Sequence, residues 1–336
     1  MNKIRWAVMG AGGIANIRGI PGLLECEQVE LVAVMDKSAV AAENTAKKYN
    51  IPHWFTDEEE MLRTVPCDAV YIATPVPFHY SQAMLALQYG AHVLTEKPFV
   101  MKGEDGRTLL EAFKTAGKHL SVGYMMGRHN LHQKAKTILH EGGIGDLTLV
   151  RMLFTCWYPD IPGAWRQKKA LGGGGCIVDL AVHCMELFTS ITGEDIQEVK
   201  AYYGTNTFQY EVEDSAVIAF RTASGVMGHI DVNFNIPDGI PSRLEMYGTA
   251  GSIVAEGTLS QTEVGILRYA YKPDNEYDAS MSSALVEPEL FYGESGNLYR
   301  KQFEAFNEVL NSGKSDYTMA ERALKIQYLT DEIYAN

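Results

Sequence analysis

Strand-like and helix-like segments alternate along the first third of this 336-residue chain, and this alternation constrains its fold more than any other feature. Short apolar runs, most of them rich in β-branched residues, occupy 3–10, 29–36, 67–75, 91–98 and 119–124. The stretches between them, 11–25, 38–50, 78–90 and 104–118, have helical spacing. Single helices between buried strands predict a doubly wound parallel sheet with right-handed crossovers. We place this α/β domain at residues 1–122.

The first turn of this predicted sheet carries a phosphate-binding pattern. Gly10, Gly12 and Ala15 form GxGxxA directly after a strand and at the start of a helix. In a Rossmann domain such glycines allow a tight turn and a close approach to a pyrophosphate at the helix N-terminus. Asp36 ends the second strand, where an acid accepts hydrogen bonds from an adenosine ribose and repels a 2′-phosphate. The pattern predicts NAD, and the neighbouring Lys37 leaves NADP possible.

The remainder of the chain has a different pattern. Alternating strand-like runs occupy 147–158, 198–208, 213–222, 225–235, 242–257 and 262–271, and they are joined by short turns. They predict an α+β domain at 123–336 with a large, mostly antiparallel open sheet, one face covered and the other available for oligomerisation. Residues 272–297 show no sustained period, so we expect a mobile segment, a cover over the site, or a contact between subunits.

One apolar segment, GGGGCIVDLAVHCMEL at 172–187, contains Asp179 and His183 four residues apart. On a helix that spacing puts both side chains on one face. Ionisable groups in a buried helix are costly unless they are paired or used. A satisfied core pair and a catalytic pair are both consistent with the segment alone.

Composition excludes several classes of partner. A formal net charge of −13 argues against nucleic acid and against anionic membranes, since both require a basic face. No apolar run reaches the roughly 20 residues of a membrane span, and the N-terminus does not resemble a signal peptide, so we expect a cytoplasmic protein.

His129 and His132, like His183 and Glu186, have metal-like spacing but no third ligand nearby, so we predict no metal site.

Several motifs together resemble the Gfo/Idh/MocA family of sugar and cyclitol oxidoreductases. They are GAGGIA at 10–15, residues 72–98 with the EKP signature, GGIGDL at 142–147, residues 164–183, and the closing helices from YRKQFEAFNEVL. The resemblance covers essentially the whole chain. The family pattern GGGxxxDxGxH is kept from Gly173 to His183 except that Ala181 replaces the last glycine.

The resemblance implies roles for particular residues. Lys97, Asp179 and His183 match the three family residues around the reacting carbon. Hydride transfer from an alcohol also requires loss of the hydroxyl proton, for which an imidazole is well suited, while a lysine can stabilise developing alkoxide. Lys97 and His183 could exchange these roles, and an ion pair with Glu96 is the alternative for Lys97. The predicted cofactor-binding residues are Gly10, Gly12, Gly13, Ile14, Ala15, Asp36, Lys37, Thr74, Pro75, His79, Glu96 and Lys97.

The substrate side is predicted from aromatic residues and cations. Aromatic rings stack on sugar C–H surfaces, and an arginine binds hydroxyls or a carboxylate. The segment 155–166 is therefore the best candidate for specificity, although a loop of aromatics packed on the core is the alternative. The predicted substrate-binding residues are Tyr124, Arg128, Trp157, Tyr158, Trp165 and Arg166.

The resulting prediction is an NAD(P)-dependent oxidoreductase that transfers a hydride between nicotinamide and a secondary alcohol or ketone carbon of a sugar, sugar derivative or cyclitol. As in many members of this family, we expect a homodimer or homotetramer. Two alternatives remain: a redox-neutral, NAD-dependent glycosidase-type enzyme working through a keto-sugar, and a non-catalytic regulator that senses a dinucleotide.

Overall fold

Six parallel strands form the first sheet of the computed structural model, in the order β3-β2-β1-β4-β5-β6. The structure describes residues 3–273, 276–277, 279–280 and 286–335. The strands are β1 (Ile4–Met9), β2 (Val29–Met35), β3 (His53–Phe55), β4 (Ala69–Ile72), β5 (His92–Thr95) and β6 (Leu120–Val122). β1 and β4 are buried almost throughout, as expected of a parallel sheet covered on both faces. The predicted doubly wound sheet is confirmed.

The helices between these strands follow the predicted alternation. They are η1 (Ala15–Gly19), α1 (Ile20–Leu24), α2 (Ala39–Tyr49), α3 (Glu58–Thr64), η2 (Val76–Phe78), α4 (His79–Gln88) and α5 (Gly103–Ala116). Ser38 and Asp57 cap the N-termini of α2 and α3 by accepting hydrogen bonds from backbone N–H groups. The sequence pattern does not predict α3 or the short strand β3.

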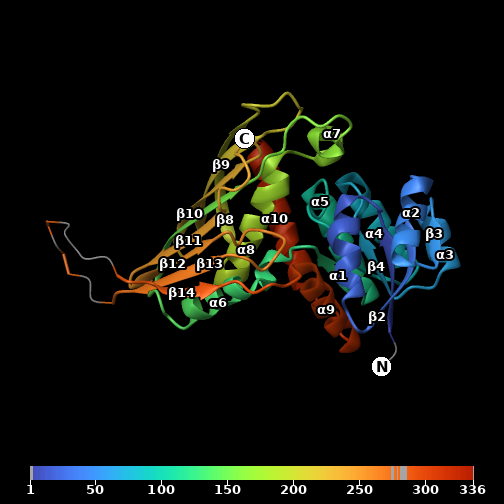
Figure 1. Cartoon of the computed structure of the whole chain (residues 1–336), viewed down its shortest axis with the longest axis horizontal. Helices are drawn as coiled ribbons and strands as arrows, with labels where there is room; N and C mark the ends of the chain where they lie inside the picture. The colour runs from blue at the N-terminus through green and yellow to red at the C-terminus, as the bar shows by residue number, and fades with distance from the viewer. Residues whose placement is uncertain (1–2, 274–275, 278, 281–285, 336) are drawn as a thin grey trace. The chain divides into compact units, whose positions relative to one another are not determined.

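The chain divides into two compact units, and the C-terminal part belongs mostly to the first. Unit 1 comprises Met1–Met125, Lys168–Gly173 and Asn297–Asp331, and unit 2 comprises Met126–Gln167, Gly174–Gly296 and Glu332–Asn336. We expected 123–336 to form the second domain alone. Instead α9 (Leu298–Asn311) packs on unit 1, where Phe303 contacts Trp6 and Tyr71 edge to face, with ring centroids 5.4 and 5.1 Å apart. α10 (Thr318–Ala335) follows it, and both helices are drawn in red in Figure 1.

Unit 2 is built on an eight-stranded sheet in the order β14-β13-β12-β11-β7-β10-β9-β8 (Figure 1). Its strands are β7 (Leu147–Thr155), β8 (Ile196–Gly204), β9 (Ser215–Thr222), β10 (Met227–Asn233), β11 (Arg243–Gly248), β12 (Gly251–Glu256), β13 (Ile266–Tyr271) and β14 (Glu289–Tyr292). Among the described strands of this sheet, β7 and β10 are the one parallel pair, so the predicted mostly antiparallel sheet is confirmed. Alternate residues of β9 are buried, which marks one covered face.

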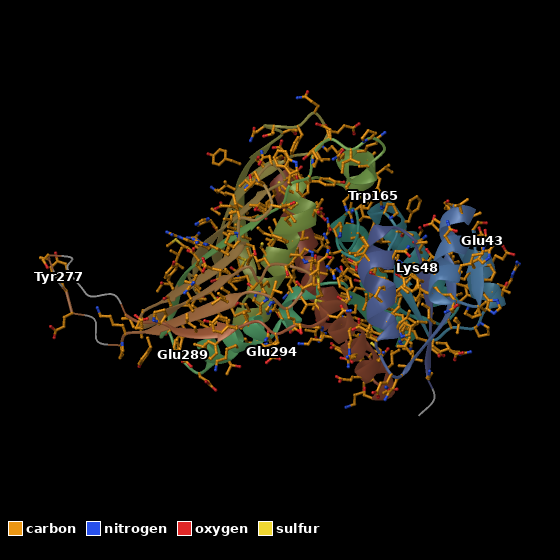
Figure 2. The ribbon with its side chains drawn as sticks, in the orientation of Figure 1. Glu43, Lys48, Trp165, Tyr277, Glu289 and Glu294 are labelled. Carbon is orange, nitrogen blue, oxygen red and sulfur yellow. The ribbon has the colours of Figure 1, made fainter. Side chains whose placement is uncertain are left out.

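Helices η3 (Met126–Arg128), α6 (Asn130–His140), η4 (Trp165–Gln167), η5 (Ile177–Ala181) and α8 (Val182–Thr192) complete unit 2, while α7 (Lys169–Gly172) belongs to unit 1. Figure 2 shows Trp165 and Glu289 at different ends of unit 2.

Two predicted segments need correction. The strand expected at 198–208 ends at Gly204, and residues 205–214 form a loop, because Asp214 draws the backbone N–H groups of Asn206, Thr207 and Phe208 onto its carboxylate. The segment 272–297, expected to be irregular, contains β14, which pairs with β13. Positions 274–275, 278 and 281–285 of that segment lie outside the described residues.

One helical stretch, Lys169–Thr192, is long and apolar enough to cross a membrane by length and composition, although we expected no such run. Its most apolar window is 83% buried inside the protein, as in the core helix of a folded domain.

Candidate active site

The glycine turn after β1 leaves an open surface on one side and packs tightly on the other. Gly10 has φ +99°, and a Cβ there would lie 2.7 Å from the Ala73 carbonyl carbon and oxygen. At Gly12 and Gly13 an added Cβ would meet nothing within 4 Å. The space beside these two glycines fits the pyrophosphate of a dinucleotide, which requires close approach to backbone.

The helix after this turn begins at Gly13, passes through a π-helical stretch, η1, and continues as α1. Ile14 precedes η1 and provides no side-chain cap for its first N–H groups. The N–H groups at a helix start are donors that suit an anion. The predicted strand, turn and helix are therefore present, with a π-helical stretch at Ala15–Gly19 that the sequence pattern does not indicate.

Asp36 is held rigidly at the end of β2. Its Oδ2 accepts a hydrogen bond from the Ala11 N–H at 2.8 Å, and its Oδ1 accepts one from the Ser38 N–H at 2.9 Å. The carboxylate therefore ties the glycine turn to the start of α2. The position expected to meet an adenosine ribose is thus set by backbone donors.

The ammonium group of Lys37 pairs with acids at the start of α3. Its Nζ lies 2.6 Å from Glu58 Oε2 and 3.9 Å from Asp57 Oδ2. Two carboxylates offset this positive charge, which weakens the case for a 2′-phosphate site at Lys37.

His79 joins two loops at the carboxyl edge of the sheet. Its Nε2 lies 2.9 Å from the Thr74 carbonyl oxygen, and its Nδ1 lies 3.0 Å from the Pro98 carbonyl oxygen. The ring is 1% exposed, and burial lowers its pKa below the ordinary value. The structure therefore assigns His79 a role in holding these loops together, while direct contact with the cofactor stays a prediction.

Glu96 follows β5 directly and is buried, and Lys97 is the next residue. Glu96 Oε1 accepts a hydrogen bond from the Tyr71 hydroxyl at 2.7 Å, and Gly123 packs against the same carboxylate. Burial, followed by the nearby Glu96, raises the pKa of Tyr71 well above its ordinary value, so its hydroxyl stays a donor. Lys97 itself is half-buried.

In unit 2, Asp179 and His183 lie on one continuous helical segment of changing pitch. Asp179 belongs to the π-helix η5, and His183 to the first turn of α8. We expected an ordinary α-helix through both residues. Short π-helical turns within α-helices are rare and often occur at functional sites. The His183 ring is 5% exposed and lies 6.4 Å, between centroids, from the ring of Phe154 on β7.

The structure brings Asp179 together with residues predicted for substrate. Asp179 Oδ1 lies 3.9 Å from Arg166 Nε, and the Arg166 guanidinium lies 4.7 Å from the ring centroid of Trp165. Burial is the largest influence on Tyr158 and raises its pKa, whereas Arg166 opposes that shift. A carboxylate, a guanidinium and two aromatic side chains therefore gather beside η5.

Trp157 extends this group to a pair of aromatic residues that the sequence analysis missed. Its ring meets Phe208 edge to face at 5.2 Å, and Phe208 stacks on Tyr210 at 5.4 Å. The two-residue spacing in TFQY at 207–210 was the available signal. The predicted strand at 198–208 includes Phe208 but not Tyr210, so it does not indicate that the two rings form a pair.

The other predicted residues are placed as follows. Tyr124 is buried in unit 1, and Arg128 ends η3 in unit 2. Among the described residues, no group of three or more His, Cys, Asp or Glu side chains is arranged to hold a metal ion.

Two sequence models of one family match the chain. The oxidoreductase family model with an NAD-binding Rossmann fold matches residues 4–124, and the Gfo/Idh/MocA C-terminal domain matches residues 132–254. The chain belongs to the Gfo/Idh/MocA oxidoreductase family. The predicted enzyme class and the nicotinamide dinucleotide cofactor are confirmed by this membership.

Several named oxidoreductases are similar to this chain. A 1,5-anhydro-D-fructose reductase of Ensifer adhaerens is 29% identical over 262 residues, which cover 78% of each chain. The scyllo-inositol 2-dehydrogenase (NAD(+)) of Bacillus subtilis strain 168 is 26% identical over 318 residues, 94% of this chain and 88% of that one. The fold also resembles an aldose-aldose oxidoreductase from Caulobacter crescentus complexed with glycerol, with a TM-score of 0.87, 22% identity, and coverage of 99% and 97% of the two chains.

Proposed function

We propose that this protein is an NAD-dependent dehydrogenase or reductase that acts on a secondary alcohol or ketone carbon of a sugar, sugar derivative or cyclitol. The observation that carries the proposal is the group of Asp179, Arg166 and Trp165, with Asp179 on the same helical segment as His183, since these side chains suit a polyhydroxylated ligand. The names of relatives that act on an anhydrosugar and on an inositol support the substrate class.

Bound NAD would accept the substrate hydride, or NADH would return it. The residues that would hold it are the open glycine turn and Asp36, in unit 1. The ion pairs of Lys37 with Glu58 and Asp57 favour NAD over NADP, because the acids offset its charge.

We assign the proton chemistry and the binding of the reacting hydroxyls to four residues of the chain. His183 takes the hydroxyl proton, since a neutral imidazole nitrogen can accept a proton from a hydroxyl. Asp179 orients that imidazole and stabilises its charged form, while Arg166 binds neighbouring hydroxyls. Lys97 donates a hydrogen bond to the developing alkoxide and stabilises its charge.

The deciding experiment is a substrate screen with the purified protein. Inositols, aldoses, ketoses and glycosides would be incubated with NAD or NADH while absorbance at the nicotinamide band is followed. We expect substrate-dependent reduction of NAD, or oxidation of NADH, with at least one polyol class. Tight NAD binding without turnover of any of these compounds would contradict the proposal, and so would release of free sugar from a glycoside without net NADH.

We also propose that the open face of the unit 2 sheet joins two or four copies of the chain. Tyr202 on β8 is 89% exposed, and its strand partner Val217 on β9 is 51% exposed. Exposed apolar side chains on paired strands mark a surface suited to association. Light scattering at micromolar concentration should give a dimer or tetramer mass. A charged substitution, Val217→Lys, should lower that mass, and a wild-type monomer would contradict the assignment.

A further inference from the structure

A buried carboxylate holds the start of the helical segment that contains Asp179. Glu213 is 6% exposed and precedes β9. Its Oε1 accepts three hydrogen bonds, from the Gly175 N–H at 2.8 Å, the Ile177 N–H at 3.1 Å and the Tyr334 hydroxyl at 2.7 Å. Its backbone carbonyl also accepts a hydrogen bond from the Cys176 N–H at 3.0 Å. Three consecutive residues of the glycine-rich turn are therefore fixed by one acid.

The glycines of this turn are required by the approach of that acid and its tyrosine. A Cβ at Gly175 would overlap the Glu213 carbonyl oxygen, and one at Gly174 would overlap the Tyr334 hydroxyl. The turn is pressed so closely against both partners that no side chain fits. This explains part of the four-glycine run, which the sequence pattern left without a physical reason.

Asp179 lies one helical turn beyond this contact. Its N–H donates to the Gly175 carbonyl oxygen at 3.1 Å, so a shift of Gly175 moves the backbone of Asp179. Residues 211–213 also contact the chain next to Arg166, because the Glu211 N–H donates to the Gln167 carbonyl oxygen at 3.2 Å. The same short segment, 211–213, therefore helps to fix the backbone positions of both Asp179 and Arg166.

We propose that Glu213, held by the Tyr334 hydroxyl, is a positioning residue that sets the placement of Asp179 relative to Arg166. The inference rests on the proposed function, since it assumes that Asp179 acts on the substrate side. It adds two residues from distant parts of the chain, neither of which touches the reacting atoms, to the machinery of the reaction.

Tyr334 suits the role of a permanent donor. It lies in the last turn of α10, and its ring meets Tyr203 edge to face at 5.6 Å. Burial, followed by the adjacent Glu213, raises the pKa of Tyr334 far above its ordinary value. The hydroxyl therefore keeps its proton across the working pH range and holds one side of the carboxylate.

The first test separates turnover from binding. Tyr334→Phe removes one donor without changing shape, and Glu213→Gln replaces the carboxylate by a weaker acceptor. Because misplacement of a reacting group lowers turnover steeply, we expect kcat to fall about tenfold in Y334F and about 100-fold in E213Q, with KM changed less than about threefold. Tyr269→Phe is the matched control, since it also removes a tyrosine hydrogen bond in unit 2, to the Gly143 carbonyl oxygen at 2.9 Å. Its kcat should equal that of the wild type.

The second test needs no substrate. Amide hydrogen exchange followed by mass spectrometry should show faster exchange at residues 174–180 in E213Q and Y334F, with Y269F unchanged there. NAD affinity should stay at the wild-type value in all three, which shows that unit 1 is folded. If E213Q fails to fold, Y334F carries both tests.

Unchanged exchange at 174–180 in Y334F, or a kcat within about twofold of the wild type, would overturn the proposal, since a lost charge-assisted hydrogen bond has a larger effect. If the wild-type protein turns over no polyol, the proposed function fails instead, and the exchange result still decides whether Glu213 holds the turn.

Discussion

Asp36 and Lys37 are the neighbouring charged residues on which the proposed preference for NAD depends. The carboxylate of Asp36 is fixed at the end of β2 by hydrogen bonds from the Ala11 and Ser38 N–H groups. Lys37 is paired with Glu58 and Asp57, so its charge is offset. The balance at this strand end favours a ribose with free hydroxyls over a phosphorylated one.

Asp36→Ser should therefore shift selectivity toward NADP. Removing the carboxylate relieves its repulsion of a 2′-phosphate, and we expect the NADP-to-NAD ratio of kcat/KM to rise about tenfold or more. Steady-state kinetics with both cofactors would measure this. Glu30→Ser, at an exposed acid of the same strand, is the control and should leave the ratio unchanged. A D36S ratio equal to that of the wild type would contradict the assignment.

Lys97→Ala should remove turnover while preserving cofactor binding. If Lys97 stabilises the developing alkoxide, its loss should lower kcat about 100- to 1,000-fold, as loss of comparable donors does. NAD affinity, measured by fluorescence titration, should change only slightly. Lys102→Ala, at an exposed lysine just before α5, is the control. A K97A enzyme with wild-type kcat would exclude the role.

At the level of elements, one glycine of the turn between β1 and η1 is required for folding and another for the expected binding of the cofactor. Gly10 packs against the backbone of Ala73, whereas Gly12 faces open space. Two glycines in one motif are therefore required for different physical reasons. The first is required by a left-handed φ and a close backbone contact, the second by the expected ligand.

Alanine substitutions should distinguish these reasons. Gly10→Ala should lower the free energy of unfolding by about 2–4 kcal/mol, because the new Cβ overlaps Ala73 at a strained φ. Gly12→Ala should leave the melting temperature unchanged and weaken NAD binding about tenfold or more, since its Cβ enters the space for the pyrophosphate. Thermal denaturation and NAD titration would test both. Wild-type NAD affinity in G12A would show that the cofactor does not approach this glycine.

At the level of the whole molecule, buried histidines make stability depend on pH. Burial, followed by the charge of His129, lowers the pKa of His132 in unit 2 to about 3. Burial also lowers the pKa of His92 in unit 1 to about 4. Both rings stay neutral when folded, whereas in the unfolded chain a histidine titrates near 6.5.

The sign of the effect follows from proton binding. Between pH 6.5 and about pH 4, the unfolded chain binds protons that the folded chain does not, so the free energy of unfolding falls with falling pH. The contribution of His132 is complete above pH 6.5, and about 3 kcal/mol of it is lost by about pH 4.

Urea unfolding at about pH 7.5 and about pH 5 should show this loss. His132→Gln should reduce the difference between the two pH values, even if the variant is less stable at both. His53→Gln, at an exposed histidine, should keep the wild-type difference. An H132Q protein with the wild-type pH dependence would show that His132 does not contribute.

Local sequence patterns determined the sheet types, the glycine turn, the acid at the end of β2 and the shared helical segment of Asp179 and His183. Each of these depends on residues close together in the chain, whose period and turn chemistry can be read directly. The same patterns led to a wrong strand at 205–208, because an apolar alternation does not show that Asp214 captures that backbone.

Only the tertiary structure decided the partners that hold these elements in place. The pairing of Lys37 with Glu58, the packing of Phe303 on Trp6, and the hydrogen bond from Tyr334 to Glu213 join residues 21, 297 and 121 positions apart. Such contacts form where separate elements pack together, and no local periodicity specifies which distant side chain will fill a given space. Short sequence motifs determine which reactive residues this protein has. Contacts between parts of the chain that are far apart in sequence determine where those residues lie.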